Sequence, residues 1–424
     1  MSFVSTRDTS GAVGSGRVDL ATALLAGLAP DGGLYLPEHV PPIDFAGLPP
    51  DDFPELATRI LTPWLEEFMT LREVEALAAD AFSFPVPLVR ISDSVSILEL
   101  FHGPTLSFKD FGGRTLGRLL GHLLQEKGEE VTIVVATSGD TGSAVADGCS
   151  GIPGVRVVLL YPAGQVSPTQ EQQLIVEREG VTALRVHGSF DDCQRLVKGA
   201  FADSRLRHKR LSTANSINMG RLLPQMLYYV HAAKQYEAPV TFCVPSGNLG
   251  NLTAGMLAAE SGMPVAGFLA AHNRNDFFPA WLSNAERAFN ASVQTPSNAM
   301  DVGAPSNFER LTAMYAREEL VSRVSGVSVT DKDTVSSIRC TLQETGYVAD
   351  PHTAVGLEAV RRLQPEGQVV VLSTAHPAKF PETVEPAIGR KVTVPPQLTQ
   401  LQQMPSSVQD MEADAGALAD AILG

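Results

Sequence analysis

Short apolar runs, rich in valine and isoleucine, alternate with amphipathic helical stretches from about residue 95 onwards. Strands that are buried on both faces have such continuous apolar runs, because neither face meets water. Alternation of strands with helices is typical of parallel sheets of the doubly wound kind. The pattern therefore predicts an α/β chain. The expected strands are residues 96–101, 131–136, 155–161, 182–186, 240–244, 265–271 and 369–372.

Helical spacing of apolar residues accompanies these strands. Leu116, Leu119, Leu120 and Leu123 stand at the i, i+3, i+4 and i+7 positions of one helix face, which predicts a helix there. The region before the first expected strand is partly helical and is interrupted by turns rich in proline and glycine. The expected helices are residues 19–28, 53–69, 71–82, 113–125, 222–236, 252–260 and 406–423.

The net charge of the chain indicates which classes of partner it can bind. Its 424 residues include 32 Lys and Arg against 47 Asp and Glu, which gives a formal net charge of −15. Nucleic-acid binding needs a basic surface, so we expect no nucleic-acid partner. An anionic substrate would need a local cationic pocket that acts against this overall charge.

The cysteines and the first residues indicate a location. The four cysteines include no Cys-x-x-Cys pair and are too scattered for a disulfide framework. The first residues lack the basic and apolar segments of a signal peptide. No apolar run reaches the ~18 residues that a membrane helix needs. We therefore expect a cytoplasmic protein that does not enter a membrane.

Four loops that follow expected strands carry unusual residues, and open α/β sheets bind ligands at these strand ends. The first loop places Lys109 between Phe108 and Phe111. Only 8 of the 32 basic residues are lysines, so arginine is the usual cation of this chain. A Schiff base needs a primary amine that can lose its proton, and apolar neighbours favour that neutral form. The alternative is a lysine that extends to solvent from the first turn of a helix.

The second loop reads TSGDTG at residues 137–142 and leads into an expected helix. Backbone N–H groups and hydroxyls at a helix N-terminus bind anions, so this segment is a candidate site for a carboxylate. Taken alone, it fits an ordinary strand-to-helix turn with a good N-cap better.

The third loop reads SGNLGN at residues 246–251. Small residues let the backbone approach a ligand closely, and several N–H groups can then converge on one phosphate. The segment lacks the Gly-Lys-Ser/Thr ending of a Walker A motif, and no Mg²⁺ ligands are evident. It therefore fits a phosphate that is held but not transferred, such as that of a cofactor. The alternative is a glycine-rich turn that only packs a helix on a strand.

The fourth loop places the hydroxyls of Ser373 and Thr374 at a strand end. A hydroxyl can hydrogen-bond a pyridine nitrogen without protonating it, whereas a carboxylate favours the pyridinium. The alternative is a plain β-turn. Lys379 follows in a less confined setting, beyond His376 and Pro377, and is the rival candidate for a Schiff base.

A further segment at residues 213–221 places amides, hydroxyls and Arg221 just before an expected helix. Arg221 can hold a phosphate through two parallel hydrogen bonds; the alternative is an arginine at the start of a surface helix. The nine histidines show no His-Glu-x-x-His spacing, and the chain has no Gly-x-Ser-x-Gly motif. We therefore expect neither a metal site nor a Ser-His-Asp hydrolase.

Seven segments, in order along nearly the whole chain, resemble threonine synthase. They are GLAPDGGLY (27–35), HGPTLSFKDF (102–111), TSGDTG (137–142), PSGNLGN (245–251), DVGAPSNFER (301–310), DPHTAVG (350–356) and STAHPAKF (373–380). Seven segments in register are far more specific than any one motif. The family depends on pyridoxal 5′-phosphate and has fold type II, which it shares with tryptophan synthase β and serine dehydratase.

The resemblance implies a role for each loop. Lys109 would carry the cofactor as a Schiff base and then shuttle protons, and Thr374 would face the pyridine nitrogen. The cofactor phosphate would be held by Ser246, Gly247, Asn248, Leu249, Gly250 and Asn251. The substrate would be contacted by Thr137, Ser138, Asp140 and Thr141, and its anionic groups by Asn215, Ser216 and Arg221.

The resemblance also implies the reaction. O-phospho-L-homoserine and water would give L-threonine and phosphate by γ-elimination and β-addition. The alternatives are a phospho-lyase that stops at 2-oxobutyrate and a serine or threonine dehydratase. A non-catalytic amino-acid-binding protein on this scaffold would be expected to lack the lysine or the phosphate loop, and this chain keeps both.

The implied organisation has two parallel-sheet α/β domains and a helical N-terminal region, in a monomer or homodimer. The expected boundaries are residues 1–95 for the N-terminal region, 96–130 and 225–424 for the large cofactor-binding domain, and 131–224 for the small domain.

Overall fold

The computed structural model describes residues 1–8, 16–284 and 286–424, with the side chains of all of them except 126 and 127. The chain forms two compact units, each built on its own sheet. Unit 1 comprises Met1, Leu36–Phe108 and Leu222–Thr393, and unit 2 comprises Ser2–Tyr35, Lys109–Arg221 and Val394–Gly424. Among the described residues, no helix has the length and apolar character needed to cross a membrane.

Unit 1 is built on six strands: β3 (Leu88–Arg90), β4 (Val95–Glu99), β9 (Val240–Pro245), β10 (Val265–His272), β11 (Val324–Ser328) and β12 (Val369–Ser373). Its helices are α2 (Phe53–Leu65), α3 (Leu71–Ala81), α9 (Pro224–Ala233), α10 (Gly250–Glu260), α11 (Phe277–Ser283), α12 (Phe308–Met314), α13 (Arg317–Arg323), α14 (Asp331–Thr345), α15 (Pro351–Leu363) and α16 (Pro381–Ile388). Two short 3-10 turns are η2 (Asn298–Met300) and η3 (Pro377–Lys379).

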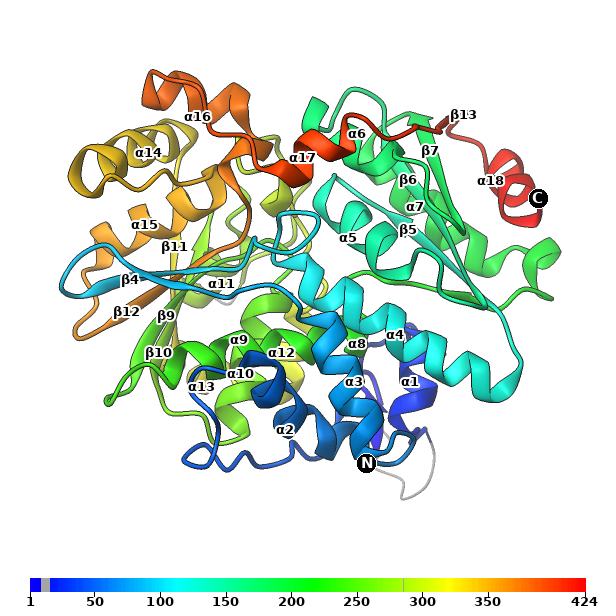
Figure 1. Ribbon diagram of the computed structural model, residues 1–424, viewed down its shortest axis with the longest axis horizontal. Helices are drawn as coiled ribbons and strands as arrows, with labels where there is room; N and C mark the ends of the chain where they lie inside the picture. The colour runs from blue at the N-terminus through cyan, green and yellow to red at the C-terminus, as the bar shows by residue number, and fades with distance from the viewer. Residues whose placement is uncertain (9–15, 285) are drawn as a thin grey trace. The chain divides into compact units, whose positions relative to one another are not determined.

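The sheet of unit 1 has the strand order β11-β10-β9-β12-β4-β3, and only β3 runs antiparallel to its neighbour. Figure 1 shows α14, α15 and α16 on one face of this sheet and α9 and α10 on the other. Ile97, Cys243, Leu269 and Val371 come from four neighbouring strands and are buried together with Val355 of α15. Burial on both faces explains why these strands are continuous apolar runs.

Unit 2 is built on five parallel strands: β5 (Val131–Ala136), β6 (Val155–Pro162), β7 (Val181–His187), β8 (Leu211–Ser212) and β13 (Gln409–Glu412), in the order β13-β7-β6-β5-β8. Its helices are α1 (Leu20–Ala26), α4 (Lys109–Lys127), α5 (Asp140–Cys149), α6 (Pro168–Ile175), α7 (Phe190–Ala202), α17 (Pro396–Leu401) and α18 (Ala415–Leu423), with η1 (Ser204–Leu206). Strand β1 (Phe3–Ser5) precedes them, and β2 (Tyr35–Pro37) and α8 (Met219–Leu222) lie at the boundaries in sequence.

The seven strands expected from the apolar runs are all present, with ends within two residues of those expected. The single helix expected at residues 406–423 is wrong. Residues 409–412 instead pair with β7 as strand β13, and α18 begins only after Asp414, whose side chain accepts a hydrogen bond from the N–H of Ala417. The helix expected at 222–236 is α9, which begins at Pro224 and ends at Ala233, whereas Leu222 is the last residue of α8.

The boundaries of the two units differ from those of the expected domains. Residues 2–35 belong to unit 2, whereas the rest of the expected N-terminal region belongs to unit 1. Helix α4 belongs to unit 2 because it packs closely on α5: a Cβ at Gly113 or Gly117 would overlap with the backbone of Ala144 or Gly148. The last residues join unit 2 because β13 extends its sheet.

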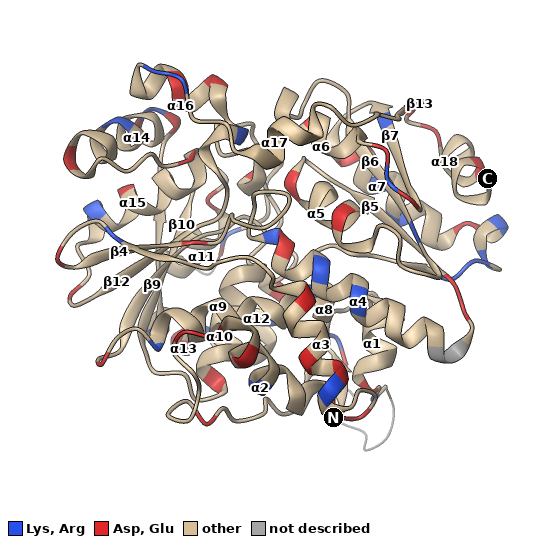
Figure 2. Cartoon of the chain, viewed as in Figure 1, with Lys and Arg blue, Asp and Glu red and all other residues tan. Residues whose placement is uncertain are grey.

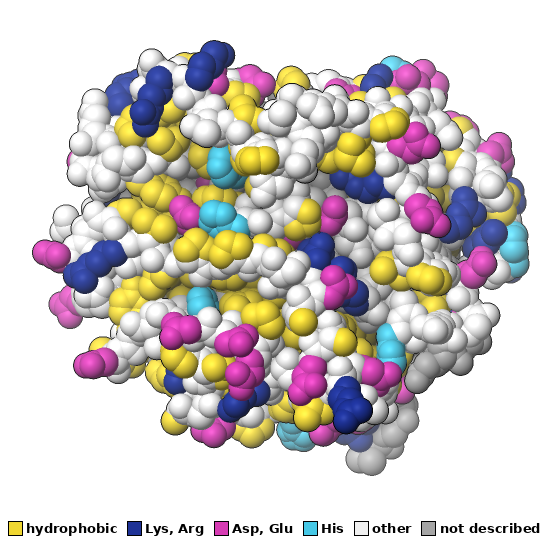
Figure 3. All heavy atoms as spheres, in the orientation of Figure 1, with side chains coloured by type: hydrophobic (Ala, Val, Ile, Leu, Met, Phe, Trp, Pro, Cys, Tyr) yellow, Lys and Arg dark blue, Asp and Glu magenta, His cyan; other side chains and the backbone are white. Residues whose placement is uncertain are grey.

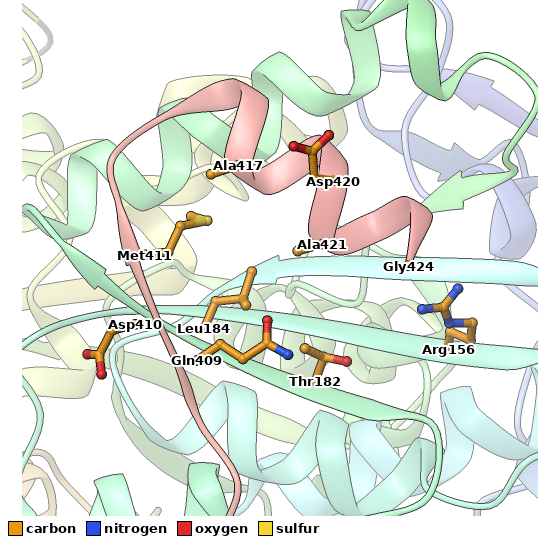
Figure 4. Close-up of a pocket in the computed structure, with 10 residues that line it drawn as sticks. All are labelled: Arg156, Thr182, Leu184, Gln409, Asp410, Met411, Ala417, Asp420, Ala421 and Gly424. Atoms are coloured by element: carbon orange, nitrogen blue, oxygen red, sulfur yellow. The ribbon is translucent and has the colours of Figure 1, made fainter.

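Charged and apolar residues occur in both units. Figure 2 shows acidic and basic residues interspersed along the elements of both units. On the face in Figure 3, apolar side chains are interrupted by polar and charged ones. Unit 2 has a hollow of about 570 Å³ between α18 and strands β6, β7 and β13 (Figure 4). The residues that line this hollow include none of the predicted site residues.

Candidate functional site

Two of the predicted loops start at one edge of the sheet in unit 1. Strands β9 and β12 are neighbours and parallel, with Val371 paired to Cys243, so their carboxyl ends lie at the same edge. Strand β9 leads into residues 246–251, which we call the phosphate loop, and β12 leads into Thr374. Loops at such an edge form the ligand site of open α/β sheets.

The segment before Lys109 is attached to this same edge. The N–H of Phe108 donates to the carbonyl oxygen of Thr374 at 2.8 Å. One residue earlier, Ser107 forms an antiparallel bridge with Ala375. Lys109 follows Phe108 in the chain.

Lys379 binds the turn at residues 105–106, which precedes Lys109 in the chain. Its side chain is fully buried, and Nζ donates to the carbonyl oxygen of Thr105 at 2.8 Å. In the same turn Leu106 has a positive φ of 58°, and its carbonyl oxygen accepts from the N–H of His376 at 3.1 Å. A positive φ in a leucine persists only where the surroundings impose it. Lys379 therefore has a structural role in the turn that leads to Lys109.

Lys109 itself is half-buried and is the first residue of α4. The helix was expected to start at residue 113 and starts one turn earlier. Because α4 packs on α5 within unit 2, Lys109 and the TSGDTG turn begin two helices that are in direct contact.

The TSGDTG turn is organised by the hydroxyl of Thr137. This oxygen accepts from the N–H of Gly139 at 3.0 Å and from the N–H of Gly142 at 2.8 Å. Thr137 is buried, whereas Ser138 and Thr141 are half-buried. Thr137 therefore shapes the turn, and the neighbouring hydroxyls are the more accessible ones.

Asp140 is the first residue of α5 and is almost fully buried. Its Oδ1 accepts from Nε2 of Gln170 at 2.9 Å. The other end of that amide, Oε1, accepts from the N–H of Ser167 at 3.2 Å, in a capping box that starts α6. An N–H can only donate, so Ser167 requires the oxygen of Gln170 on its side and leaves the NH₂ group for Asp140. Gln170 thus orients a carboxylate that the sequence placed among the substrate contacts.

Asn215, Ser216 and Arg221 lie at the end of the middle segment of unit 2, Lys109–Arg221. Asn215 and Ser216 are half-buried. Arg221 is 2% exposed, and its Nη1 donates to the carbonyl oxygen of Ala214 at 2.7 Å. Burial lowers the pKa of Arg221 to about 10, so the guanidinium is charged at neutral pH. Arg221 is therefore a cation inside unit 2, not the surface arginine of the alternative interpretation.

The side chains at the two ends of the phosphate loop bind each other. The hydroxyl of Ser246 donates to Oδ1 of Asn251 at 2.7 Å, and Nδ2 of Asn251 donates to the carbonyl oxygen of Pro245 at 2.8 Å. Both residues are buried. These bonds close the loop on itself and leave the backbone as its source of donors.

The backbone of the phosphate loop suits a phosphate group. The N–H groups of Gly247, Leu249, Gly250 and Asn251 donate to no acceptor within the described part of the chain. They stand at the start of α10, where the helix dipole favours an anion. A Cβ at residue 247 would lie 2.7 Å from Cα of Met300, so only glycine fits this approach. These residues fit the phosphate of a cofactor such as pyridoxal 5′-phosphate.

The two hydroxyls after β12 differ in their surroundings. Oγ of Ser373 shares a hydrogen bond of 2.8 Å with Oγ1 of Thr353 on α15. The hydroxyl of Thr374 forms no hydrogen bond with any described residue, although the residue is only 5% exposed. Of the two, Thr374 therefore keeps a hydroxyl for a ligand.

Family comparisons identify the class of protein. Residues 85–375, which contain every predicted site residue, match the family model described as "Pyridoxal-phosphate dependent enzyme". The chain thus belongs to the pyridoxal-phosphate-dependent enzymes. Residues 2–82 match "Threonine synthase N terminus" and residues 353–422 match "Threonine synthase, C-terminal".

Curated relatives identify the family within that class. The chain is 39% identical to the threonine synthase of Serratia marcescens over 417 residues, which are 96% of this chain and 97% of that protein. It is also 39% identical to the threonine synthase of Escherichia coli K12 over 411 residues, or 95% and 96% of the two chains. The chain belongs to the threonine synthase family.

Solved structures confirm the expected fold. The pyridoxal-phosphate-bound threonine synthase from Brucella melitensis matches with a TM-score of 0.93 and 34% identity, covering 100% of this chain and 98% of that one. The yeast threonine synthase matches with a TM-score of 0.90 and 31% identity, with the same coverage. The α/β fold of type II and the pyridoxal-phosphate cofactor inferred from the resemblance are thereby confirmed.

Some residues that shape the site were not singled out from the sequence. Gln170 orients Asp140, and Asn307 contacts the phosphate loop through Asn248. Gln170 had a weak signal, because it stands three residues after Ser167 as in a capping box. Asn307 lies inside a segment of the resemblance, but nothing in its spacing indicates a contact with a loop 59 residues earlier.

Proposed function

We propose that this protein converts O-phospho-L-homoserine and water into L-threonine and phosphate, with pyridoxal 5′-phosphate as its cofactor. The observation that carries the proposal is the convergence at one sheet edge of unit 1. The phosphate loop, Thr374 and the residue before Lys109 all start or end there. Membership of the threonine synthase family supplies the substrate.

In this proposal the phosphate loop, Ser246 to Asn251, holds the cofactor phosphate through backbone N–H groups. The side chains of Ser246 and Asn251 keep the loop closed. Thr374 would hold the pyridine nitrogen through a hydrogen bond from its hydroxyl. A hydroxyl does not protonate that nitrogen, so the cofactor is kept a moderate electron acceptor.

Lys109 would hold the cofactor aldehyde through its amine, and its Nζ would move protons on the substrate. When bound, the cofactor supplies an electron sink for the charge left by each departing proton. Protons leave Cα and then Cβ of the substrate, and phosphate leaves Cγ. Protons return to Cγ and Cα, and water supplies the hydroxyl at Cβ, which gives threonine. Lys109 is the group that takes the Cα proton and returns it.

Two sets of residues in unit 2 would bind the substrate. Ser138, Asp140 and Thr141 contact the amino-acid part, with Thr137 shaping the turn that carries them. The anionic groups of the substrate are bound by Asn215, Ser216 and Arg221. The buried charge of Arg221 supports this assignment, because the chain as a whole is acidic.

The test is an assay of purified protein with O-phospho-L-homoserine that measures phosphate, threonine and 2-oxobutyrate in the same samples. We expect phosphate and threonine in equal amounts. Phosphate accompanied by 2-oxobutyrate would instead identify a phospho-lyase. Deamination of serine or threonine without a phosphorylated substrate would identify a dehydratase.

Lys109→Ala tests the central residue. The variant should lose the absorbance of the lysine-bound cofactor and all turnover. Lys391→Ala is the control, because Lys391 is an exposed lysine whose Nζ donates to Glu385 at 2.7 Å. If Lys109→Ala keeps both signals, the role passes to Lys379.

We also propose a cytoplasmic location and a monomeric or homodimeric state. All four cysteines are free thiols, and three of them are buried, as is usual in a reducing compartment. Cell fractionation and analytical ultracentrifugation test the two statements. Secretion of the protein, or a larger assembly, would contradict them.

A further inference from the structure

Residues 301–310 form one of the segments of the resemblance, yet none of them has a role in the proposed chemistry. In unit 1 this segment follows η2 and leads into α12. Met300, Ser306 and Asn307 all approach the phosphate loop. The segment therefore supports that loop from one side.

Asn248 of the phosphate loop is held at two atoms. The backbone N–H of Asn307 donates to the carbonyl oxygen of Asn248 at 3.3 Å, and Nδ2 of Asn307 donates to the same oxygen at 3.1 Å. The N–H of Ser306 donates to Oδ1 of Asn248. Asn307 thus fixes the direction of one peptide carbonyl in the loop.

That carbonyl sets the direction of a neighbouring donor. The C=O of Asn248 and the N–H of Leu249 belong to one peptide unit, which is planar and trans, so they point in opposite directions. Leu249 has a positive φ of 60°, which an L-residue keeps only where its surroundings impose it. The donors of Asn307 supply this constraint and direct the Leu249 N–H away from Asn307.

Arg310 determines which way round the Asn307 amide lies. Its Nη1 donates to Oδ1 of Asn307 at 2.6 Å. A guanidinium group only donates, so Oδ1 must face Arg310 and Nδ2 must face Asn248. Arg310 is fully buried, and burial lowers its pKa to about 9. The group therefore remains a charged donor at neutral pH.

We propose that Asn307 and Arg310 are positioning residues for the cofactor phosphate. Arg310 orients the Asn307 amide, and Asn307 holds the Asn248 peptide so that the Leu249 N–H is presented to the phosphate. Neither side chain needs to touch the cofactor. The inference rests on the proposed role of residues 246–251 as the phosphate loop.

The test compares cofactor affinity in Asn307→Ala, Arg310→Met and the double variant. Apo-protein is titrated with pyridoxal 5′-phosphate, and phosphorus NMR reports the environment of the bound phosphate. Each single change should raise the Kd about tenfold, as expected for the loss of a buried hydrogen bond, and should shift the phosphorus resonance towards that of free cofactor. Because Arg310 acts through Asn307, the double variant should bind no more weakly than the weaker single variant.

Arg317→Met is the matched control. Arg317 donates to the carbonyl oxygens of Trp281 and Leu282 from α13, the helix after α12. Its replacement should lower the thermal stability of the apo-protein and leave both the Kd and the phosphorus resonance unchanged. If Arg310→Met does not fold, Asn307→Ala and Arg310→Lys, which keeps a donor, carry the comparison.

A Kd within about twofold of wild type in folded Asn307→Ala overturns the inference, and so does an additive loss in the double variant. Failure of the proposed function has a different signature. If the wild-type protein binds pyridoxal, which lacks the phosphate, as tightly as pyridoxal 5′-phosphate, the loop does not hold a phosphate at all.

Discussion

Replacing Gly247 with alanine should weaken cofactor binding about 5- to 150-fold. The new Cβ would lie 2.7 Å from Cα of Met300 and 3.1 Å from its carbonyl carbon and oxygen. Ordinary contacts begin at 3.4 Å, so the atoms must separate by about 0.7 Å. Backbone atoms cannot move aside by a change of rotamer. Such overpacking costs about 1–3 kcal/mol. If the phosphate loop moves to relieve this overlap, the same free energy is lost from cofactor binding. Each ~1.4 kcal/mol raises the Kd about tenfold.

The assay is a titration of apo-protein with pyridoxal 5′-phosphate, with thermal unfolding of the apo-protein measured in parallel. Gly199→Ala is the control, because a Cβ at Gly199 on α7 would meet no atom within 4 Å. That change should leave the Kd unaltered and slightly stabilise the helix. If Gly247→Ala folds and binds the cofactor with a Kd within about twofold of wild type, the contact of the loop with Met300 does not control cofactor binding.

Three further predictions test other parts of the site. Gln170→Glu places a second carboxyl group beside Asp140, so kcat/KM should fall about tenfold or more near pH 8 and recover partly as the new group is protonated at lower pH. Gln172→Glu on the same helix should change it less than about twofold. Thr374→Asp should favour a protonated ring nitrogen and raise the share of 2-oxobutyrate measured by NMR; an unchanged product ratio would count against this role. Burial raises the pKa of Asp301 to about 6, above the ~3.9 of an ordinary aspartate. The stability linked to its protonation is therefore fully present below about pH 4 and is lost as the pH rises through 6. Asp301→Asn should therefore remove about 2–3 kcal/mol of pH dependence from denaturant unfolding between about pH 4 and pH 7.

The strands could be predicted from the sequence because a strand that is buried on both faces has a run of consecutive apolar residues. All six residues of β5 are buried, and the apolar run at 131–136 has the same ends as the strand. Consecutive residues are enough to predict such a strand, and no contact with a distant part of the chain has to be known. Parallel pairing followed from the alternation with helices.

The C-terminal segment shows where local information ends. Residues 409–412 have three exposed side chains and one buried one, Met411, so they lack a buried strand's apolar run. They form a strand because β7 offers an unpaired edge, and Met411 packs with residues of α7 and α18. A partner more than 200 residues away decides this structure, and composition does not identify it.

In the candidate site, too, some residues could be predicted from the sequence and others could not. Lys109, the phosphate loop and Thr374 could be proposed from sequence because each brings its own chemistry: an amine, a row of small residues and a hydroxyl at a strand end. The groups that orient such residues are ordinary amides whose role depends on one hydrogen bond.

Helix α6 illustrates why those amides escape prediction. Gln170, Gln172 and Gln173 lie within one turn and have the same side chain. Gln170 donates to Asp140, whereas Gln172 donates to the carbonyl oxygen of Leu401. The difference arises because Ser167 fixes the oxygen end of the Gln170 amide, so its NH₂ group must face the carboxylate. Amide identity is thus local, but amide direction depends on which donors and acceptors the fold brings to each end, and only the folded chain contains that information.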